Sequence, residues 1–567
     1  MATNSTRSSS SKKARAREQA IPHRDEEAPV SNALPENVWR IGIIVIFVIA
    51  AGLRLYDLNL VPLHHDEGVN GNFLVRLVRE GFYQYDPDNY HGPTLYYFSA
   101  LIPWTVKLLF GSAARDNYGL TTFTIRLVPV VFGLATIVLV FMLRRRLGTI
   151  ATLAAALMLA VSPGAVYLSR YFIHESLFVF FTLGIVVAGV KLYDERNPSY
   201  LIPGAASAAL LFATKETAFI SAGVLLIALA LTWLYMRYTG KPSSPPGRRR
   251  NREASFSEKL EDAIAEFGGK TTVAYNLGLA LAVFAALYLL FYSSFLTNNK
   301  GISDSFHTFA VWSKTSSQAH VHSASTYFFW LLRQESTLLF LGAAGAVIVV
   351  LKPRNSLALF SALWAFGLIA AYSLIDYKTP WLMLSFLVPL ALISGYAIQA
   401  IYQMDRGQFR LVAVIFFAAI AVATYQSIDL NFINYDKDDE KYVYVYAHSK
   451  RDLLDLVRQV EQIADENAGQ KTGITIVSPD YWPLPWYFRN FRGVGYFGRM
   501  AATSEPIIIA NENQQEEVER NFGELYRQVR SKSDDGSFEL RPGVKLLLYV
   551  RRSGFLPQTN PPSIRNP

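Results

Sequence analysis

Two adjacent carboxylates, Asp66 and Glu67, lie in a polar segment that follows the first apolar stretch of the chain. A carboxylate in such a segment can accept a proton from an attacking hydroxyl or bind a divalent cation. An acidic loop that caps the following helix would have the same sequence, because Asp favours helix N-termini. The flanking His64 and His65 favour a functional site over a simple cap.

Histidines form a second group of candidates, which could bind a metal ion together with Asp66 or Glu67. Their spacings match no compact zinc motif, and only the HxH pair would share one face of an extended segment. Hydrogen bonding that responds to pH is the simpler alternative. A divalent metal is therefore one possible cofactor, with Glu67 as a carboxylate ligand. The histidines in question are His64, His65, His91, His174, His320 and His322, of which His91, His320 and His322 are the leading candidate metal ligands.

Three cations, Arg170, Lys215 and Lys378, lie at the ends of apolar segments. Cations at a membrane surface can bind a lipid phosphate or pyrophosphate. Snorkelling of long side chains to lipid headgroups is the alternative. Because all three face the same polar loops in the topology derived below, we favour the phosphate site. Glu175, close to Arg170 in sequence, joins this group of site candidates.

The composition indicates a membrane protein. Of the 567 residues, 51% are hydrophobic and only 17% are charged, whereas soluble domains carry about 25% charged residues. The absence of cysteine excludes disulfides, thiolate ligands and cysteine nucleophiles. The net charge of +9 comes from basic residues between apolar segments, so it indicates membrane topology and not a nucleic-acid partner.

A transmembrane helix needs roughly 20 apolar residues, and about eleven segments meet this condition. They occupy 41–59, 122–143, 149–167, 172–191, 199–215, 217–237, 273–296, 327–350, 355–375, 380–401 and 409–428.

Basic loops orient these segments. We expect 1–38 to be a disordered basic cytoplasmic tail, because positive charge favours the cytoplasmic side. If the short apolar segment 95–110 lies along the membrane surface, every later basic loop also falls inside, including the Arg-rich 238–272 loop. The first external loop, 60–121, then contains interfacial helices, and the chain after 429 lies outside.

Residues 430–567 have a higher charge density and contain no further span. The apolar runs 473–478, 506–510 and 544–550 predict buried strands. Amphipathic patterns at 449–467 and around 513–530 predict helices. The sequence thus predicts a transmembrane domain over 39–429 and a soluble extracytoplasmic α/β domain over 430–567. In this topology the candidate residues collect at one face, and we expect them to line a single water-facing pocket beside the outer leaflet.

Several motifs resemble the GT-C membrane glycosyltransferases, and the resemblance extends over about residues 41–400. They include RLYDL, HHDEG, YHGPTLYYF, SPGAVYLSRYFIHESLFVFF and ATKETAF. The nearest families are the protein O-mannosyltransferases (family 39) and the lipid A aminoarabinose transferases. YKTPWLMLSF and PLPWYFRNFRGVGYFG are similar to a prokaryotic subgroup of flippase-activity-associated proteins.

The resemblance implies a GT-C bundle in a prokaryotic plasma membrane. It implies inverting transfer of a sugar from a polyprenyl-phosphate donor to a glycan, lipid or protein acceptor on the extracytoplasmic face. Asp66, with Glu67 beside it, corresponds to the family's base, and Arg170, Glu175 and Lys215 match further motif positions. The chain has His91-Gly-Pro-Thr where relatives carry HPPL or EKPPL, so His91 replaces an acidic residue in some of them.

Two other functions compete with catalysis. The subgroup name suggests a non-catalytic protein that binds lipid-linked sugars or assists a flippase on a GT-C scaffold. The intact Asp66–Glu67 pair with nearby cations favours an enzyme. A transporter is the weaker alternative, because the charges cluster at one membrane face and not near the midplane.

Overall fold

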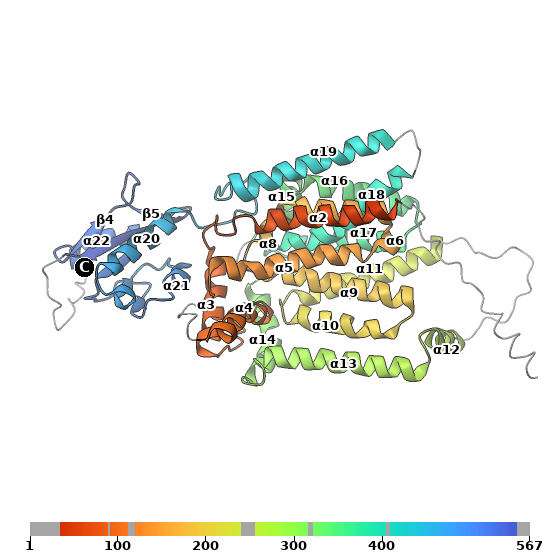
Figure 1. Cartoon of the computed structure of the whole chain (residues 1–567), viewed down its shortest axis with the longest axis horizontal. Coiled ribbons are helices and arrows are strands. Elements are labelled where there is room, and N and C mark those ends of the chain that lie inside the picture. Colours follow the sequence, from red (N-terminus) through yellow and green to blue (C-terminus); the bar gives the residue numbers. More distant parts are fainter. Residues whose placement is uncertain are drawn as a thin grey trace, which may run out of the picture.

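The apolar segments fold as long helices that lie side by side in one bundle, and a domain containing a β-sheet adjoins one end of it (Figure 1). The computed structural model describes residues 34–88, 91–111, 119–239, 256–315, 321–403 and 409–552. Most of the expected 1–38 tail, much of the 238–272 loop, and His320 lie outside the described residues.

Eight of the described helices are long and apolar enough to cross a membrane. Each coincides with one of the predicted spans, since the length of an apolar run is a local property of the sequence. The chain is therefore a multi-pass membrane protein. The helices are α2 (Glu36–Leu55), α5 (Thr122–Phe141), α9 (Glu175–Glu195), α11 (Ala218–Thr239), α13 (Lys270–Tyr292), α17 (Ser356–Ser373), α18 (Leu384–Tyr402, preceded by a 3-10 turn, Pro380–Met383) and α19 (Phe409–Ile428, followed by a π turn, Asp429–Ile433).

Three predicted spans are not straight, full-length helices. The segment 149–167 forms α7 (Thr149–Val161) and α8 (Pro163–Ser169), which meet at 60° where Pro163 begins the second helix. The segment 327–350 bends by 111° between α15 (Thr326–Gln334) and α16 (Ser336–Leu351). The segment 199–215 contains only a short apolar helix, α10 (Leu201–Phe212), after the turn Pro198–Tyr200. With each bent pair taken as one span, the described residues hold up to 10 spans and this shorter helix.

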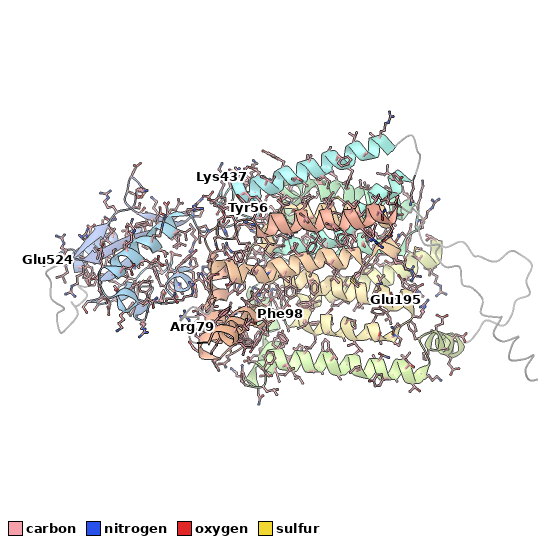
Figure 2. The ribbon with its side chains drawn as sticks, in the orientation of Figure 1. Tyr56, Arg79, Phe98, Glu195, Lys437 and Glu524 are labelled. Carbon is pink, nitrogen blue, oxygen red and sulfur yellow. The ribbon has the colours of Figure 1, made fainter. Side chains whose placement is uncertain are left out.

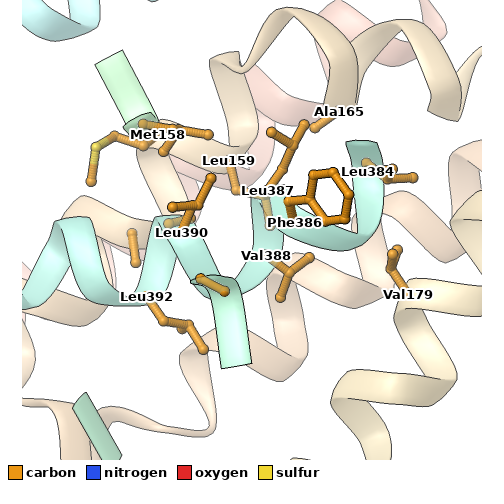
Figure 3. Close-up of a cluster of buried hydrophobic side chains, with 14 of the residues drawn as sticks. Met158, Leu159, Ala165, Val179, Leu384, Phe386, Leu387, Val388, Leu390 and Leu392 are labelled. Carbon is orange, nitrogen blue, oxygen red and sulfur yellow. The ribbon is translucent and has the colours of Figure 1, made fainter. Parts of the chain in front are cut away.

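Helix α18 lies at the centre of the bundle. All of its residues from Leu384 to Gln399 are buried, and Figure 3 shows its leucines beside Met158 and Leu159 of α7 and Val179 of α9. By contrast, α13 has only a few buried residues, so its side chains face the lipid. The central helix carries the segment before Leu384 into the end of the bundle, where the candidate site lies.

The segment 60–121, expected to be the first external loop, contains two helices at the end of the bundle that adjoins the sheet domain (Figure 1). They are α3 (His65–Glu80) and α4 (Thr94–Phe110), and α4 is not among the helices that qualify as spans. Its exposed Leu108, Leu109 and Phe110 agree with the expected interfacial position. Helices α6 (Arg144–Leu147) and α12 (Phe256–Glu266), which belong to the basic loops, lie at the opposite end of the bundle (Figure 1).

The C-terminal domain contains a mixed six-stranded sheet, as the strand–helix alternation predicts. The strand order is β2-β1-β3-β6-β4, and β5 also pairs with β6. β1 is parallel to β2 and β3, whereas β6 is antiparallel to β3, β4 and β5. The strands are β1 (Ile474–Ile476), β2 (Val494–Tyr496), β3 (Ile507–Asn511), β4 (Tyr526–Val529), β5 (Phe538–Arg541) and β6 (Val544–Arg551).

Both faces of this sheet are covered. In β3, Ile507 and Ile509 pack with α20 (Asp452–Asp465), whereas Ile508 packs with α22 (Gln515–Phe522) on the other face. The alternation follows from the two-residue period of a strand. The predicted strands 473–478, 506–510 and 544–550 and the 449–467 helix are confirmed. The 513–530 segment is helical only to Phe522 and then forms β4.

Candidate active site

Asp66 lies in the first turn of α3, so the segment expected to be a loop is the start of a helix. His64 is the N-cap: its Nδ1 accepts a hydrogen bond from the Asp66 backbone N–H at 3.1 Å. Glu67 accepts one from the His64 backbone N–H at 3.0 Å, which completes a capping box. The Asp66 side chain is 40% exposed and lines a cavity of about 480 Å³.

Glu67 points away from this cavity. Its carboxylate is fully buried and accepts hydrogen bonds from Arg126 at 2.7 and 2.6 Å and from the Phe172 backbone N–H at 2.8 Å. Successive residues of a helix project about 100° apart, so one of two adjacent carboxylates can face the cavity while the other faces the core. The structure thus divides the predicted pair into a cavity residue and a structural ion pair, and it does not bring Glu67 to the site as a base or metal ligand.

The three predicted cations also separate. Arg170 donates to the backbone carbonyls of Tyr56 at 2.5 Å and Asp57 at 2.9 Å, which lie just beyond the end of α2. Lys378 donates to the carbonyls of His322 and Ile375. Neither side chain lines the cavity. Both therefore stabilise the backbone around the site, where they satisfy carbonyls left by helix ends and turns.

Lys215 is the predicted cation that reaches the cavity. It lies in the turn between α10 and α11, is nearly fully buried, and donates to Glu175 at 2.5 Å. Burial alone would lower the pKa of Lys215, but the negative charges of Glu175 and Glu216 outweigh it and raise the pKa above its ordinary value. The lysine therefore stays charged at neutral pH. Glu175, the first residue of α9, also lines the cavity.

His91 is held beside Lys215 by a short backbone pairing. The two residues form an antiparallel bridge, and Gly92 donates to the Thr214 carbonyl at 3.0 Å. A Cβ at Gly92 would lie 2.0 Å from the Ala213 oxygen, so this close approach requires glycine. The His91 ring lines the cavity and lies 3.1 Å from a Glu216 oxygen.

His174 lies behind His91, with the two ring centroids 5.0 Å apart. Its Nε2 is 3.0 Å from the Gly92 carbonyl oxygen, and it does not line the cavity. Burial, reinforced by His91 and Lys215, lowers the pKa of His174 well below 6.5. His174 therefore supports the Gly92 turn as a neutral ring.

The cavity joins residues from several elements at the end of the bundle near the C-terminal domain. Its charged residues come from α3, the segment before α4, α9, the α10–α11 turn and β5. Its aromatic side chains come from α14 (Lys300–Thr315), the end of α17, and the segments before α18 and before α20. The expectation of one shared pocket holds for Asp66, His65, His91, Glu175 and Lys215. The lining residues that the sequence did not single out include Trp312, Tyr372, Trp381, Tyr446 and Arg541.

The C-terminal domain forms one wall of the cavity and packs directly on α3. Cβ atoms added to Gly68 and Gly71 would lie 2.5 Å from Pro483 and 2.6 Å from Trp486, so both glycines permit this packing. The Tyr487 hydroxyl accepts a hydrogen bond from the Leu63 backbone N–H at 2.9 Å. At the other end of α3, Arg79 (Figure 2) donates to Asn490 at 2.5 Å. The helix that carries Asp66 is therefore positioned by the C-terminal domain.

The candidate metal ligands in the described part of the chain do not lie close together. Over the ranges that the structure describes, no three His, Asp or Glu side chains form a group that could hold a metal ion. Glu67 is occupied by Arg126, and the His322 ring packs 5.5 Å from that of Trp330. His320 lies outside the described residues.

Comparisons with known proteins address the fold. Residues 101–241 match the family model "Dolichyl-phosphate-mannose-protein mannosyltransferase", a segment that includes Glu175 and Lys215. A search of curated protein sequences finds no match to the chain.

Solved structures match nearly the whole chain. ArnT from Cupriavidus metallidurans bound to undecaprenyl phosphate superposes with a TM-score of 0.55 at 12% identity, covering 92% of this chain and 99% of ArnT. The same protein in the apo state gives a TM-score of 0.56 at 10% identity, covering 90% of this chain and 98% of ArnT.

A third match is the archaeal oligosaccharyltransferase AglB from Archaeoglobus fulgidus, in complex with an inhibitory peptide and a dolichol-phosphate. Its TM-score is 0.51 at 12% identity, covering 92% of this chain and 75% of AglB. These proteins and the family model agree on one architecture. The chain has the fold of the GT-C membrane glycosyltransferases.

Proposed function

We propose that this protein is a membrane glycosyltransferase that moves a sugar, with inversion, from a polyprenyl-phosphate donor to an acceptor hydroxyl. The observation that carries the proposal is that Asp66 and Lys215, far apart in sequence, line one cavity at the end of the bundle. One is an exposed carboxylate and the other a buried ammonium group. The reaction needs both kinds of group within reach of one substrate.

Asp66 is suited to act as the base. Its carboxylate opens to the cavity, unlike that of Glu67, and α3 is held on one side by the capping box and on the other by the C-terminal domain. An acceptor hydroxyl beside Asp66 would attack the anomeric carbon of the donor from the face opposite the phosphate. The new C–O bond forms as the bond to phosphate breaks, and the hydroxyl proton passes to Asp66. General-base catalysis of this kind contributes about 10²–10⁴-fold.

Lys215 is suited to stabilise the departing phosphate. An ammonium group has three N–H donors, and Glu175 accepts a hydrogen bond from Lys215. The remaining donors can bind phosphate oxygens as negative charge develops on them. ArnT from Cupriavidus metallidurans was solved with undecaprenyl phosphate and AglB with a dolichol-phosphate, which supports a lipid phosphate as the donor group.

We propose that the reaction takes place on the extracytoplasmic side of a prokaryotic plasma membrane, with the N-terminus in the cytoplasm. The basic segments lie at the opposite end of the bundle from the cavity, as the positive-inside rule requires (Figure 1). The acceptor is a glycan, lipid or protein that reaches the cavity from the aqueous side. No nucleotide takes part in the transfer.

The test uses purified full-length protein in lipid nanodiscs with a radiolabelled polyprenyl-phosphate sugar and an extract of cell-envelope glycans, lipids and proteins as the source of acceptor hydroxyls. Asp66→Asn is expected to lose at least about 10²-fold in transfer rate while binding the donor and melting like wild type. Glu80→Gln, an exposed carboxylate on the same helix, is the matched control and should transfer normally. Full activity of Asp66→Asn would remove Asp66 as the base. Donor binding without turnover by wild type would instead indicate a non-catalytic lipid-sugar binding protein.

A further inference from the structure

Arg541 brings a positive charge from the C-terminal domain into the cavity. It is the last residue of β5, and it and Lys215 are the two lysine or arginine side chains among the lining residues. The sequence at this position carries no motif. Only the packing of the sheet domain on α3 places the guanidinium beside the cavity.

The hydrogen bonds of Arg541 differ from those of the structural arginines nearby. Arg126 donates five hydrogen bonds to Glu67 and to backbone carbonyls, which uses all of its N–H groups. Arg541 donates one, from Nη2 to Asp480, and its side chain is 23% exposed. A guanidinium that lines a cavity is suited to bind a carboxylate or phosphate in a bidentate manner.

Arg541 and Lys215 come from different domains of the protein. Asp480, its partner, is close in sequence to Trp482, and the Trp482 ring lies 6.1 Å from that of His65, the residue before Asp66. Lys215 belongs to the helical bundle, where a lipid-linked phosphate enters from the bilayer. Arg541 belongs to the domain outside the bundle, on the side from which a water-soluble group would approach Asp66.

Aromatic side chains line the same cavity. Trp381 and Tyr446 both line it, with ring centroids 6.2 Å apart, and His64 Nε2 lies 3.1 Å from the Tyr446 carbonyl oxygen. Flat aromatic surfaces beside a few polar groups suit a ligand with apolar faces and polar edges, such as a sugar ring. A peptide acceptor would not require this combination with an arginine.

We propose that Arg541 and the Trp381–Tyr446 wall form an acceptor subsite for a saccharide that carries an acidic group, a carboxylate or a phosphate. This inference rests on the proposed transferase function and names its acceptor class. The anionic group binds the Arg541 guanidinium, the ring packs against Trp381 and Tyr446, and a hydroxyl of the same sugar faces Asp66.

The test compares methyl β-D-glucuronide, methyl β-D-glucoside 6-phosphate and uncharged methyl β-D-glucoside, with binding measured by saturation-transfer NMR on the full-length protein in nanodiscs. Wild type should bind at least one acidic glycoside about tenfold more tightly than the neutral one, as expected for a charge-assisted hydrogen bond. The two acidic probes distinguish a carboxylate from a phosphate. Arg541→Gln should abolish the preference and leave binding of the neutral glycoside unchanged. Arg527→Gln, at an exposed position of β4 in the same domain, is the matched control.

Three results would overturn the inference: equal binding of all three glycosides, binding of none, or an acidic preference that survives in Arg541→Gln. A loss of undecaprenyl-phosphate binding in Arg541→Gln would also overturn it, because the arginine would then serve the donor. A different result, the absence of donor turnover, would refute the transferase proposal. A protein that transfers sugar without an acidic preference refutes the subsite alone. One that binds acidic glycosides without turnover refutes the transferase and leaves a binding site for acidic sugars that has no acceptor role.

Discussion

The buried carboxylate of Glu67 accepts two hydrogen bonds from the Arg126 guanidinium, at 2.7 and 2.6 Å, and this pair joins the start of α3 to the start of α5. Arg126 also donates to the carbonyls of Leu58 and Val61 in the segment that leads into α3. The pair therefore holds the backbone on which Asp66 is mounted, while Asp66 itself faces the cavity.

Glu67→Gln should destabilise the protein. Removing one partner of a buried ion pair leaves an uncompensated charge, which costs about 3–5 kcal/mol of unfolding free energy. We expect a clear fall in the melting temperature followed by tryptophan fluorescence in nanodiscs. Asp66→Asn, which removes the neighbouring but exposed charge, should melt within a degree or two of wild type. A Glu67→Gln protein as stable as wild type would contradict the structural role.

Lys215→Gln should lower transfer by about 10²–10³-fold, the usual effect of removing a donor that stabilises an oxyanion. The loss should appear in kcat as well as in donor binding, because the phosphate gains charge in the transition state. Lys191→Gln, at an i,i+4 ion pair of α9, is the control and should retain full activity. Lys215→Arg is a control for folding, because it keeps the positive charge that pairs with Glu175. Normal turnover by Lys215→Gln would exclude this lysine from the phosphate site.

Gly71→Ala should impair the docking of the C-terminal domain. Alanine is favoured over glycine within a helix by about 1 kcal/mol, so a loss of stability must come from the contact with Trp486 at 2.6 Å. We expect faster proteolysis of residues after 430 and slower sugar transfer. Gly52→Ala in α2 is the control, because nothing lies within 4 Å of its added Cβ. Unchanged proteolysis of Gly71→Ala would show that the domain does not depend on this contact.

Stability should fall below neutral pH because of buried histidines, of which His448 is one and His174 another. Burial, reinforced by the neighbouring His64, Arg126 and Lys450, lowers the pKa of His448 well below 6.5. The unfolded chain thus binds a proton near pH 6.5 that the folded protein does not, so acidification through this range favours unfolding. The melting temperature should drop between about pH 7.5 and 5.5.

His448→Phe should reduce this pH dependence, since the ring still stacks on His64 at a centroid distance near the native 5.2 Å. His307→Gln, at an exposed position of α14, should leave the pH dependence unchanged. The same slope in wild type and His448→Phe would assign the effect to another group.

The topology can be tested because the chain contains no native cysteine. Glu524 lies in the C-terminal domain and Glu195 at the opposite end of the bundle (Figure 2). Glu524→Cys should react with a membrane-impermeant maleimide in intact cells, whereas Glu195→Cys should react only after the cells are permeabilised. The reverse pattern would place the cavity on the cytoplasmic side.

The sequence alone determined the features that depend on short-range properties of the chain. The lengths of the apolar runs predicted the eight straight membrane helices, shorter apolar runs predicted β1, β3 and β6, and the 3.6-residue period predicted α20. It also singled out Asp66 and Lys215 as candidates, because charged residues at the ends of apolar helices are conspicuous.

Tertiary structure alone decided which candidates share the site. Asp66 and Glu67 are adjacent carboxylates that the sequence does not distinguish. Because successive helix residues point in different directions, Asp66 faces the cavity and Glu67 faces Arg126. Arg170 and Lys378 were diverted to backbone carbonyls by helix ends whose positions no local pattern specifies. Arg541 entered the site only through the docking of a separate domain. Contacts between distant segments depend on how the helices and strands pack together. Local sequence patterns do not show that packing.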